Sequence, residues 1–276
     1  MNRNLYNEKT DEAWNKVYTK LERNGLIEQQ HQRHAVGAFM KWGIACAAVL
    51  LCIIISAVYI TNMHTPQMLT QRNDEANSTL VKTLEDGSVV YLAGNSSLQY
   101  PVHFQENKRN VILHGNALFD VAKNKTRPFF IDTKYATIEV VGTSFNIKSN
   151  DKVLFELSVI RGKVKVKDKK AGNEVFVNVG ETVVLSPNGR LIVKRTKVLY
   201  TSQYNNYLQF KDETLGNIIR VINMRSAGTK LQTLPEFASR RLTVSFSNDT
   251  PDMEAILISE ALNLQYTVEG NVITIK

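Results

Sequence analysis

The longest apolar run of the chain lies near its N-terminus and contains no charged residue. It is the stretch WGIACAAVLLCIIISAVYITNM, residues 42–63. As a helix with a rise of 1.5 Å per residue it would be about 33 Å long, enough to cross a hydrocarbon core of about 30 Å. The run is longer than the apolar part of a signal peptide, and roughly 40 residues precede it. We therefore predict a retained transmembrane helix.

The basic residues around this run predict its orientation. Arg33 and Lys41 precede it closely, whereas the first basic residue after it is Arg72. Loops on the cytoplasmic side carry the excess of Lys and Arg. We therefore expect residues 1–41 in the cytoplasm, and a linker at residues 64–78 followed by the rest of the chain on the other side.

A shorter amphipathic pattern precedes the apolar run. Four apolar side chains at helical spacing form one stripe: Trp14, Val17, Tyr18 and Leu21. Thr10 can cap the helix, and Asn24-Gly25 can end it. An isolated helix of this length is marginal in water, so the stripe is expected to bind another surface. A partner protein is favoured over the inner membrane leaflet, because the polar face mixes acidic and basic residues.

From residue 79 the pattern changes to short β-rich runs separated by turns. Val89–Leu92 lies between the turn pairs Asp86-Gly87 and Gly94-Asn95, and similar runs recur as far as Leu191–Val193. No segment of this region has a helical period. The pattern predicts an all-β domain over residues 79–198, either a sandwich or a solenoid-like sheet.

The stretch VVGTSFNIK, residues 140–148, places a polar turn inside a strand-like run. Ser144 could be a nucleophile only with a base and an oxyanion motif, and neither is predicted beside it. We interpret Gly142 as a structural turn residue that permits a bulge or a close backbone approach. Gly87 has the same structural role in the Asp86-Gly87 turn.

After a polar linker the pattern becomes an alternation of strands and helices over residues 206–276. A strand alternates the apolar residues Leu242, Val244 and Phe246. The spacing from Phe210 to Thr214 recurs 36 residues later from Phe246 to Thr250, and each pair leads from a strand into a helix. This weak repeat predicts a small α+β domain.

Composition and motifs give no indication of catalysis. The 276 residues carry a formal charge of +8, but Lys and Arg are dispersed rather than clustered as in a nucleic-acid-binding face. The two cysteines, Cys46 and Cys52, provide no disulfide framework, and His31 and His34 have no further ligand nearby. We therefore expect no catalytic residue, no cofactor, no metal and no direct nucleic-acid partner.

Several sequence blocks, in this order and spacing, resemble those of the FecR-like anti-sigma regulators of the Bacteroidetes type. They are LEDGSVVYLAGNSSLQYP, NALFDVAKNKTRPFFIDT, VVGTSFNIKS, VIRGKVKV and VNVGETVVLSPNG. Asn116 stands where the family commonly has glutamate. The C-terminal region resembles the domain that accompanies these regulators, and is similar in pattern to the short N-terminal domains of secretins and TonB-dependent transporters.

The resemblance implies an anti-sigma factor of the bacterial inner (cytoplasmic) membrane. Its cytoplasmic segment would bind an extracytoplasmic-function (ECF) sigma factor through Trp14, Val17, Tyr18 and Leu21. Its periplasmic domains would receive a signal from the signalling domain of a TonB-dependent outer-membrane transporter. The strand with Leu242, Val244 and Phe246 is the candidate contact, because an open sheet edge accepts a partner strand. The alternative is a membrane-anchored periplasmic module that binds polysaccharide or cell wall and controls no sigma factor.

The predicted fold class is thus a single-span membrane protein with an all-β periplasmic domain and a small α+β domain. The N-terminus would be cytoplasmic and both C-terminal domains periplasmic. The predicted segments are residues 1–41, 42–63, 64–78, 79–198 and 206–276.

Overall fold

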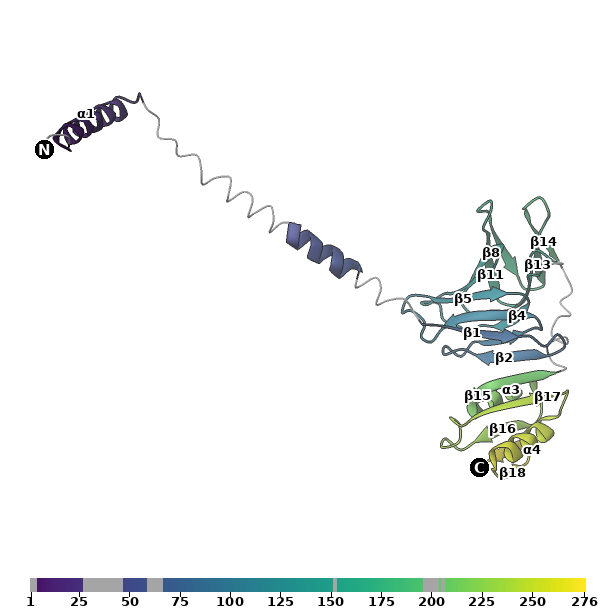
Figure 1. Ribbon diagram of the computed structural model, residues 1–276. Helices are drawn as coiled ribbons and strands as arrows, with labels where there is room; N and C mark the ends of the chain where they lie inside the picture. Colours follow the sequence, from purple (N-terminus) through teal and green to yellow (C-terminus); the bar gives the residue numbers. More distant parts are fainter. Residues whose placement is uncertain (1–3, 27–46, 59–66, 151–152, 196–203, 205–206) are drawn as a thin grey trace. The chain divides into compact units, whose positions relative to one another are not determined.

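The computed structural model of the chain describes residues 4–26, 47–58, 67–150, 153–195, 204 and 207–276. The chain divides into two units, Met1–Thr65 and Pro66–Lys276. The second unit contains all the strands of the described residues (Figure 1).

The N-terminal unit contains helix α1, Asn4–Arg23, and a helical segment at residues 47–58. Helix α1 begins before Thr10, the cap that the sequence predicted. Lys20 and Arg23 lie in its last turn, where positive charge interacts favourably with the helix dipole.

Among the described residues, no helix has both the length and the apolar character needed to cross a membrane. This contradicts the predicted single-span fold class. It also contradicts the predicted inner-membrane localisation with periplasmic C-terminal domains. Residues 42–46 and 59–63 of the predicted span lie outside the described residues.

The second unit is rich in strands arranged in mixed sheets. A seven-stranded sheet has, in spatial order, β1 (Met68–Asn73), β4 (Ser96–Pro101), β5 (Arg109–His114), β7 (Phe129–Asp132), β8 (Ala136–Val140), β11 (Lys163–Asp168) and β12 (Glu174–Asn178). Only the β5–β7 pair is parallel in this sheet.

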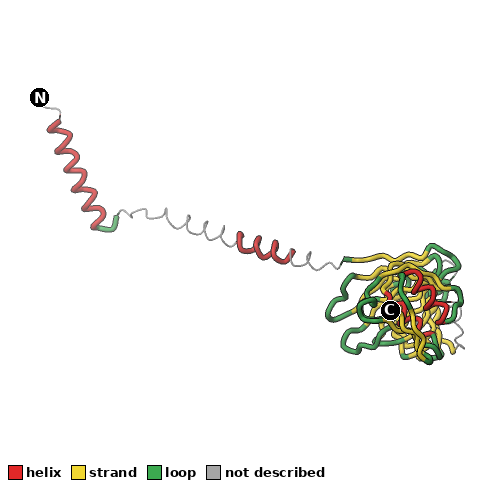
Figure 2. Tube along the Cα trace, turned by 90° about the horizontal axis from the view of Figure 1, so that it is seen from below, coloured by secondary structure: helices red, strands yellow, loops and turns green. Residues whose placement is uncertain are grey.

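A nine-stranded sheet has, in spatial order, β14 (Leu191–Arg195), β13 (Glu181–Leu185), β10 (Glu156–Arg161), β9 (Ser144–Lys148), β6 (Ala117–Asp120), β3 (Val89–Leu92), β2 (Thr79–Thr83), β15 (Leu208–Thr214) and β17 (Arg241–Phe246). A third sheet has the order β16 (Lys230–Thr233), β19 (Val272–Ile275) and β18 (Tyr266–Glu269). Helices α3 (Leu215–Arg225) and α4 (Pro251–Leu262), drawn in red beside the yellow strands in Figure 2, contact both the nine-stranded and the three-stranded sheet.

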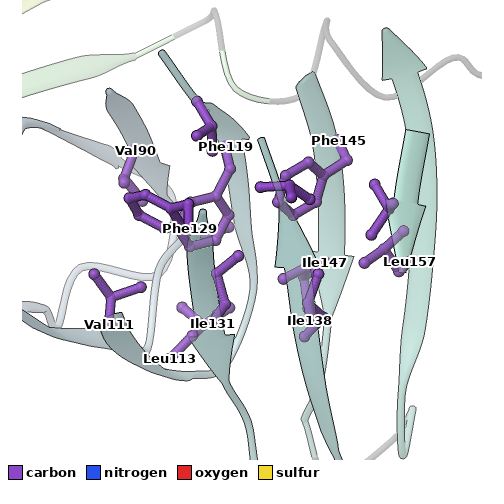
Figure 3. Close-up of a cluster of buried hydrophobic side chains, with 14 of the residues drawn as sticks. Val90, Val111, Leu113, Phe119, Phe129, Ile131, Ile138, Phe145, Ile147 and Leu157 are labelled. Atoms are coloured by element: carbon purple, nitrogen blue, oxygen red, sulfur yellow. The ribbon is translucent and has the colours of Figure 1, made fainter. Parts of the chain in front are cut away.

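The first core lies between the seven-stranded and the nine-stranded sheet. Residues of alternating positions, such as Val111 and Leu113 of β5, point into it and are buried (Figure 3). The rings of Phe119 and Phe145 stack at 5.5 Å, and Phe129 meets Phe119 edge-on at 6.4 Å. This aromatic cluster joins strands of both sheets, and such pairs stabilise a core beyond the area that they bury.

A second core covers the opposite face of the nine-stranded sheet. It combines Val81, Val89 and Tyr91 with apolar residues of α3, α4 and the three-stranded sheet. Strand β3 is therefore buried on both faces, and all four of its residues are buried. This explains why Val89–Leu92 is a continuous apolar run rather than an alternating one.

The segments expected as separate domains share the nine-stranded sheet. Strand β15, from the expected α+β domain, pairs in parallel with β2, from the expected all-β domain. Strand β1 also occupies part of residues 64–78, which the sequence predicted as a linker. The division into domains at these residues stays a prediction.

Both halves of the predicted repeat are present in the C-terminal region. Thr214 caps α3 and accepts a hydrogen bond from the backbone N–H of Asn217, and Thr250 caps α4 and accepts one from Met253. Pro251 occupies the first turn of α4, where its missing N–H leaves no partner unsatisfied.

Candidate functional site

The apolar stripe of α1 is exposed. Trp14, Val17 and Tyr18 retain 55%, 46% and 58% of their accessible surface, and Leu21 is half-buried. The rings of Trp14 and Tyr18 lie 6.3 Å apart, one helical turn from each other. Two adjacent aromatic side chains on one face of a helix are typical anchors for a partner's apolar groove.

The apolar side chains of β17 have a different environment. Leu242 and Phe246 are buried, and Val244 packs against the second core. The rings of Phe246 and Phe210 meet edge-on at 5.9 Å. Because these side chains belong to the core, a partner could reach β17 only through its backbone edge and its opposite face.

The hydrogen-bonding direction of β15 follows from a single contact. The backbone N–H of Thr79 in β2 donates to the C=O of Tyr207 at 2.9 Å. The backbone groups of successive strand residues point to opposite sides. Those of Leu208 and Phe210 therefore point towards β17.

Strand β17 forms one end of the nine-stranded sheet, and its outer side pairs with no other described strand. Phe246 and Val244 lie opposite Leu208 and Phe210, so their backbone groups face β15. Ser245, between them, consequently directs its N–H and C=O to the free edge. An unpaired edge of this kind is a template for strand addition.

The beginning of β17 is fixed by an ion pair. Arg241 lies 2.7 Å from a carboxylate oxygen of Asp212, a residue with positive φ at the irregularity in β15. The hydrogen bond from the Arg241 guanidinium lowers the pKa of the Asp212 carboxyl. The register of the β15–β17 ladder shifts at this point, and the pairing continues with Glu213 opposite Leu242 and Thr214 opposite Arg241.

The two turn glycines both have positive φ, 84° at Gly87 and 153° at Gly142. The N–H of Gly87 donates to the C=O of Leu84 at 3.0 Å, which closes the turn. At Gly142 a Cβ atom would lie 2.6 Å from the Cα of Lys123, so only glycine fits this close backbone approach.

Two buried charged residues that sequence reasoning missed connect neighbouring elements of this unit. Arg109 pairs with Asp86 at 2.6 Å and lies over the ring of Phe129 at 5.2 Å. Glu213 pairs with Lys82 at 3.0 Å and accepts a hydrogen bond from the side chain of Asn217. Glu213 thereby joins β15 and α3 to β2. No local sequence pattern distinguishes these residues from ordinary surface charges.

Within the part of the chain that the structure describes, no three His, Cys, Asp or Glu side chains group as metal ligands. Cys52 is an exposed free thiol. Cys46, His31 and His34 lie outside the described residues.

Comparison with known proteins gives one family match. Residues 73–165 match the family described as FecR protein, which confirms the resemblance over the sequence blocks of that region. Two crystal structures of a candidate anti-sigma factor from Parabacteroides distasonis are similar at 22% identity, with TM-scores of 0.47 and 0.45. Both alignments cover 76% of this chain and 98% of the other. No curated protein matches.

Proposed function

We propose that this chain, which has a FecR domain over residues 73–165, is an anti-sigma factor that binds an ECF sigma factor through α1. The observation that carries the proposal is the exposed apolar stripe of Trp14, Val17, Tyr18 and Leu21. In water such a stripe is unfavourable, and binding in a groove of a partner would remove it from solvent.

The composition of α1 supports a protein partner. Its polar face carries Glu12, Lys16, Lys20 and Glu22, a mixture of both charges. A helix that lies on an anionic membrane surface is instead rich in Lys and Arg. Mixed charges allow ion pairs around the rim of a protein groove, and these orient the helix in its partner.

The second part of the proposal concerns the input signal. The signalling domain of a TonB-dependent transporter would add a strand to the free edge of β17. The orientation of Ser245 supports this, because its N–H and C=O point away from β15. Main-chain hydrogen bonds to the edge would supply affinity, and the side chains of the added strand would supply specificity.

The test measures binding of the full chain to the ECF sigma factors of the same organism. Trp14→Ala should weaken binding by about 2–4 kcal/mol, roughly 30-fold or more in Kd, as for a buried aromatic anchor. Lys16→Ala is the matched control, because Lys16 lies on the opposite face of the same exposed helix. It should change Kd by no more than about twofold.

Fluorescence anisotropy with labelled sigma factor gives both Kd values, and circular dichroism checks that α1 stays helical. Equal effects of the two substitutions, or no binding by the unsubstituted chain, would contradict the proposed sigma-factor site. The chain would then be better interpreted as a polysaccharide- or cell-wall-binding module.

A further inference from the structure

A surface hollow of about 530 Å³ lies where α3 meets the FecR-matched strands. It is lined by the backbone of both turn glycines, by the end of β6 with the residues after it, and by Arg161, Arg220 and Met224. We infer that this hollow binds a small oxyanion with two negative charges, such as a phosphate group. The inference does not depend on the proposed sigma-factor role.

The charges of the lining residues favour such a ligand. Three cations converge from separate elements: Lys123 follows β6, Arg161 ends β10 and Arg220 belongs to α3. Asp120 is the single carboxylate among the lining residues, and it pairs with Arg161 at 2.7 Å. The formal charge of the lining is therefore +2, which complements a dianion.

Arg220 has unused hydrogen-bonding capacity. Its Nη1 donates to the C=O of Gly87 at 2.9 Å, whereas Nε and Nη2 are buried without a partner among the described residues. The other arginines of this unit with little exposure have carboxylate partners, since Arg109 pairs with Asp86 and Arg225 with Glu254. Because both atoms are buried, an oxyanion in the hollow would reach them once the Arg220 side chain turns outward, and it would then satisfy the fork of a guanidinium, which matches phosphate and carboxylate geometry.

The two glycines shape the hollow. A Cβ at Gly87 would lie 3.1 Å from Nη1 of Arg220, and a Cβ at Gly142 would lie 2.6 Å from the Cα of Lys123. The missing side chain of Gly87 therefore leaves room for Arg220, and that of Gly142 leaves room for Lys123. The β-bulge in β10, between Val159 and Arg161, places Arg161 opposite Ser144, directly after the Gly142 turn.

A bound oxyanion would contact the FecR-matched residues and α3 at once. It would therefore stabilise the contact between the C-terminal strand–helix units and the rest of the sheet, in addition to the bond from Arg220 to Gly87. In this way the concentration of a small anion would influence how firmly β15, β17 and α3 pack on the rest of the nine-stranded sheet.

Isothermal titration calorimetry of the full chain with inorganic phosphate, at constant ionic strength, tests the inference. Lys123→Gln should raise Kd about fivefold or more, since a charge that contacts the ligand is removed. The matched control is Lys125→Gln, which removes the same charge from the same exposed loop but does not line the hollow. It should change Kd less than about twofold. Arg220→Lys should weaken binding at least as much as Lys123→Gln, because the bidentate fork is lost.

Malonate, titrated in parallel, distinguishes a phosphate site from a dicarboxylate site by which of the two binds more tightly. The inference is overturned if neither anion binds with a Kd below about 20 mM, because non-specific association of ions with a charged surface accounts for weaker binding. It is equally overturned if Lys123→Gln and Lys125→Gln have the same Kd. Both lysines are exposed, so the comparison does not depend on Arg220→Lys folding normally.

Discussion

Replacing Gly142 by alanine tests whether the close approach between two connections of the sandwich is needed for its stability. The turn at Gly142 joins β8 of the seven-stranded sheet to β9 of the nine-stranded sheet. An added Cβ would lie 2.6 Å from the Cα, 2.8 Å from the Cβ and 2.9 Å from the Cγ of Lys123. The Lys123 backbone is held by the neighbouring bond from Val121 N–H to the C=O of Thr143, so it cannot move away freely.

Two contributions to the free energy of unfolding can be estimated for Gly142→Ala. The positive φ of 153° costs a residue with a Cβ about 1–2 kcal/mol. The overlap with backbone atoms of Lys123 adds about 1–3 kcal/mol, as for other overpacked sites. A loss of about 3 kcal/mol would lower Tm by roughly 6–12 °C in a unit of this size.

Thermal unfolding followed by circular dichroism measures the loss, and Gly180→Ala is the control. Gly180 has a φ of 78°, and a Cβ there would meet no atom within 4 Å. This control therefore isolates the conformational contribution, about 1 kcal/mol or roughly 2–4 °C. If both variants lose the same stability, the close approach at Gly142 contributes nothing and the structural argument is refuted.

Two further predictions concern the C-terminal region. Ser245→Pro removes an N–H that points to the free edge, so binding of a transporter signalling domain should be lost while the circular dichroism spectrum is kept; retained binding would exclude strand addition at β17, and Ser245→Ala is the control. Burial raises the pKa of Glu254 above its ordinary value of 4.5, against the opposing effect of Arg225. Ionisation of Glu254 therefore favours the unfolded chain increasingly as the pH rises from that value through the folded pKa. The Tm of Glu254→Gln relative to the unsubstituted protein should consequently increase between about pH 4 and pH 7, and a decrease would show that the pairing with Arg225 dominates.

Local sequence patterns predicted a strand that is buried along its whole length. Val89–Leu92 was found from its apolar run between two turn pairs. Strand β1, with the sequence MLTQRN, was missed because it lies at an edge of its sheet and is mostly exposed. An edge strand needs no alternating pattern, since only one of its sides pairs and much of its surface faces water.

The candidate sites show the same limit. The helical spacing of Trp14, Val17, Tyr18 and Leu21 was sufficient to predict an exposed stripe, because the whole feature lies within two turns of one helix. The alternation of Leu242, Val244 and Phe246 identified a strand face but could not show that this face is turned into the core. Arg220 was not predicted at all, because its relation to Gly87 joins residues that are distant in the sequence.

The parallel pairing of β2 with β15 also has a consequence for how the chain is made. Thr79 is translated about 130 residues before Leu208, its neighbour in the sheet. Until then β2 is the last strand of an incomplete sheet, with an open edge and the apolar face of Val81 uncovered. Contacts so distant in sequence form late and slowly. A nascent or truncated chain that stops before β15 is therefore the form of this protein most prone to aggregate. Pairing of β15 with β2 covers the open edge and completes the folding of the sheet.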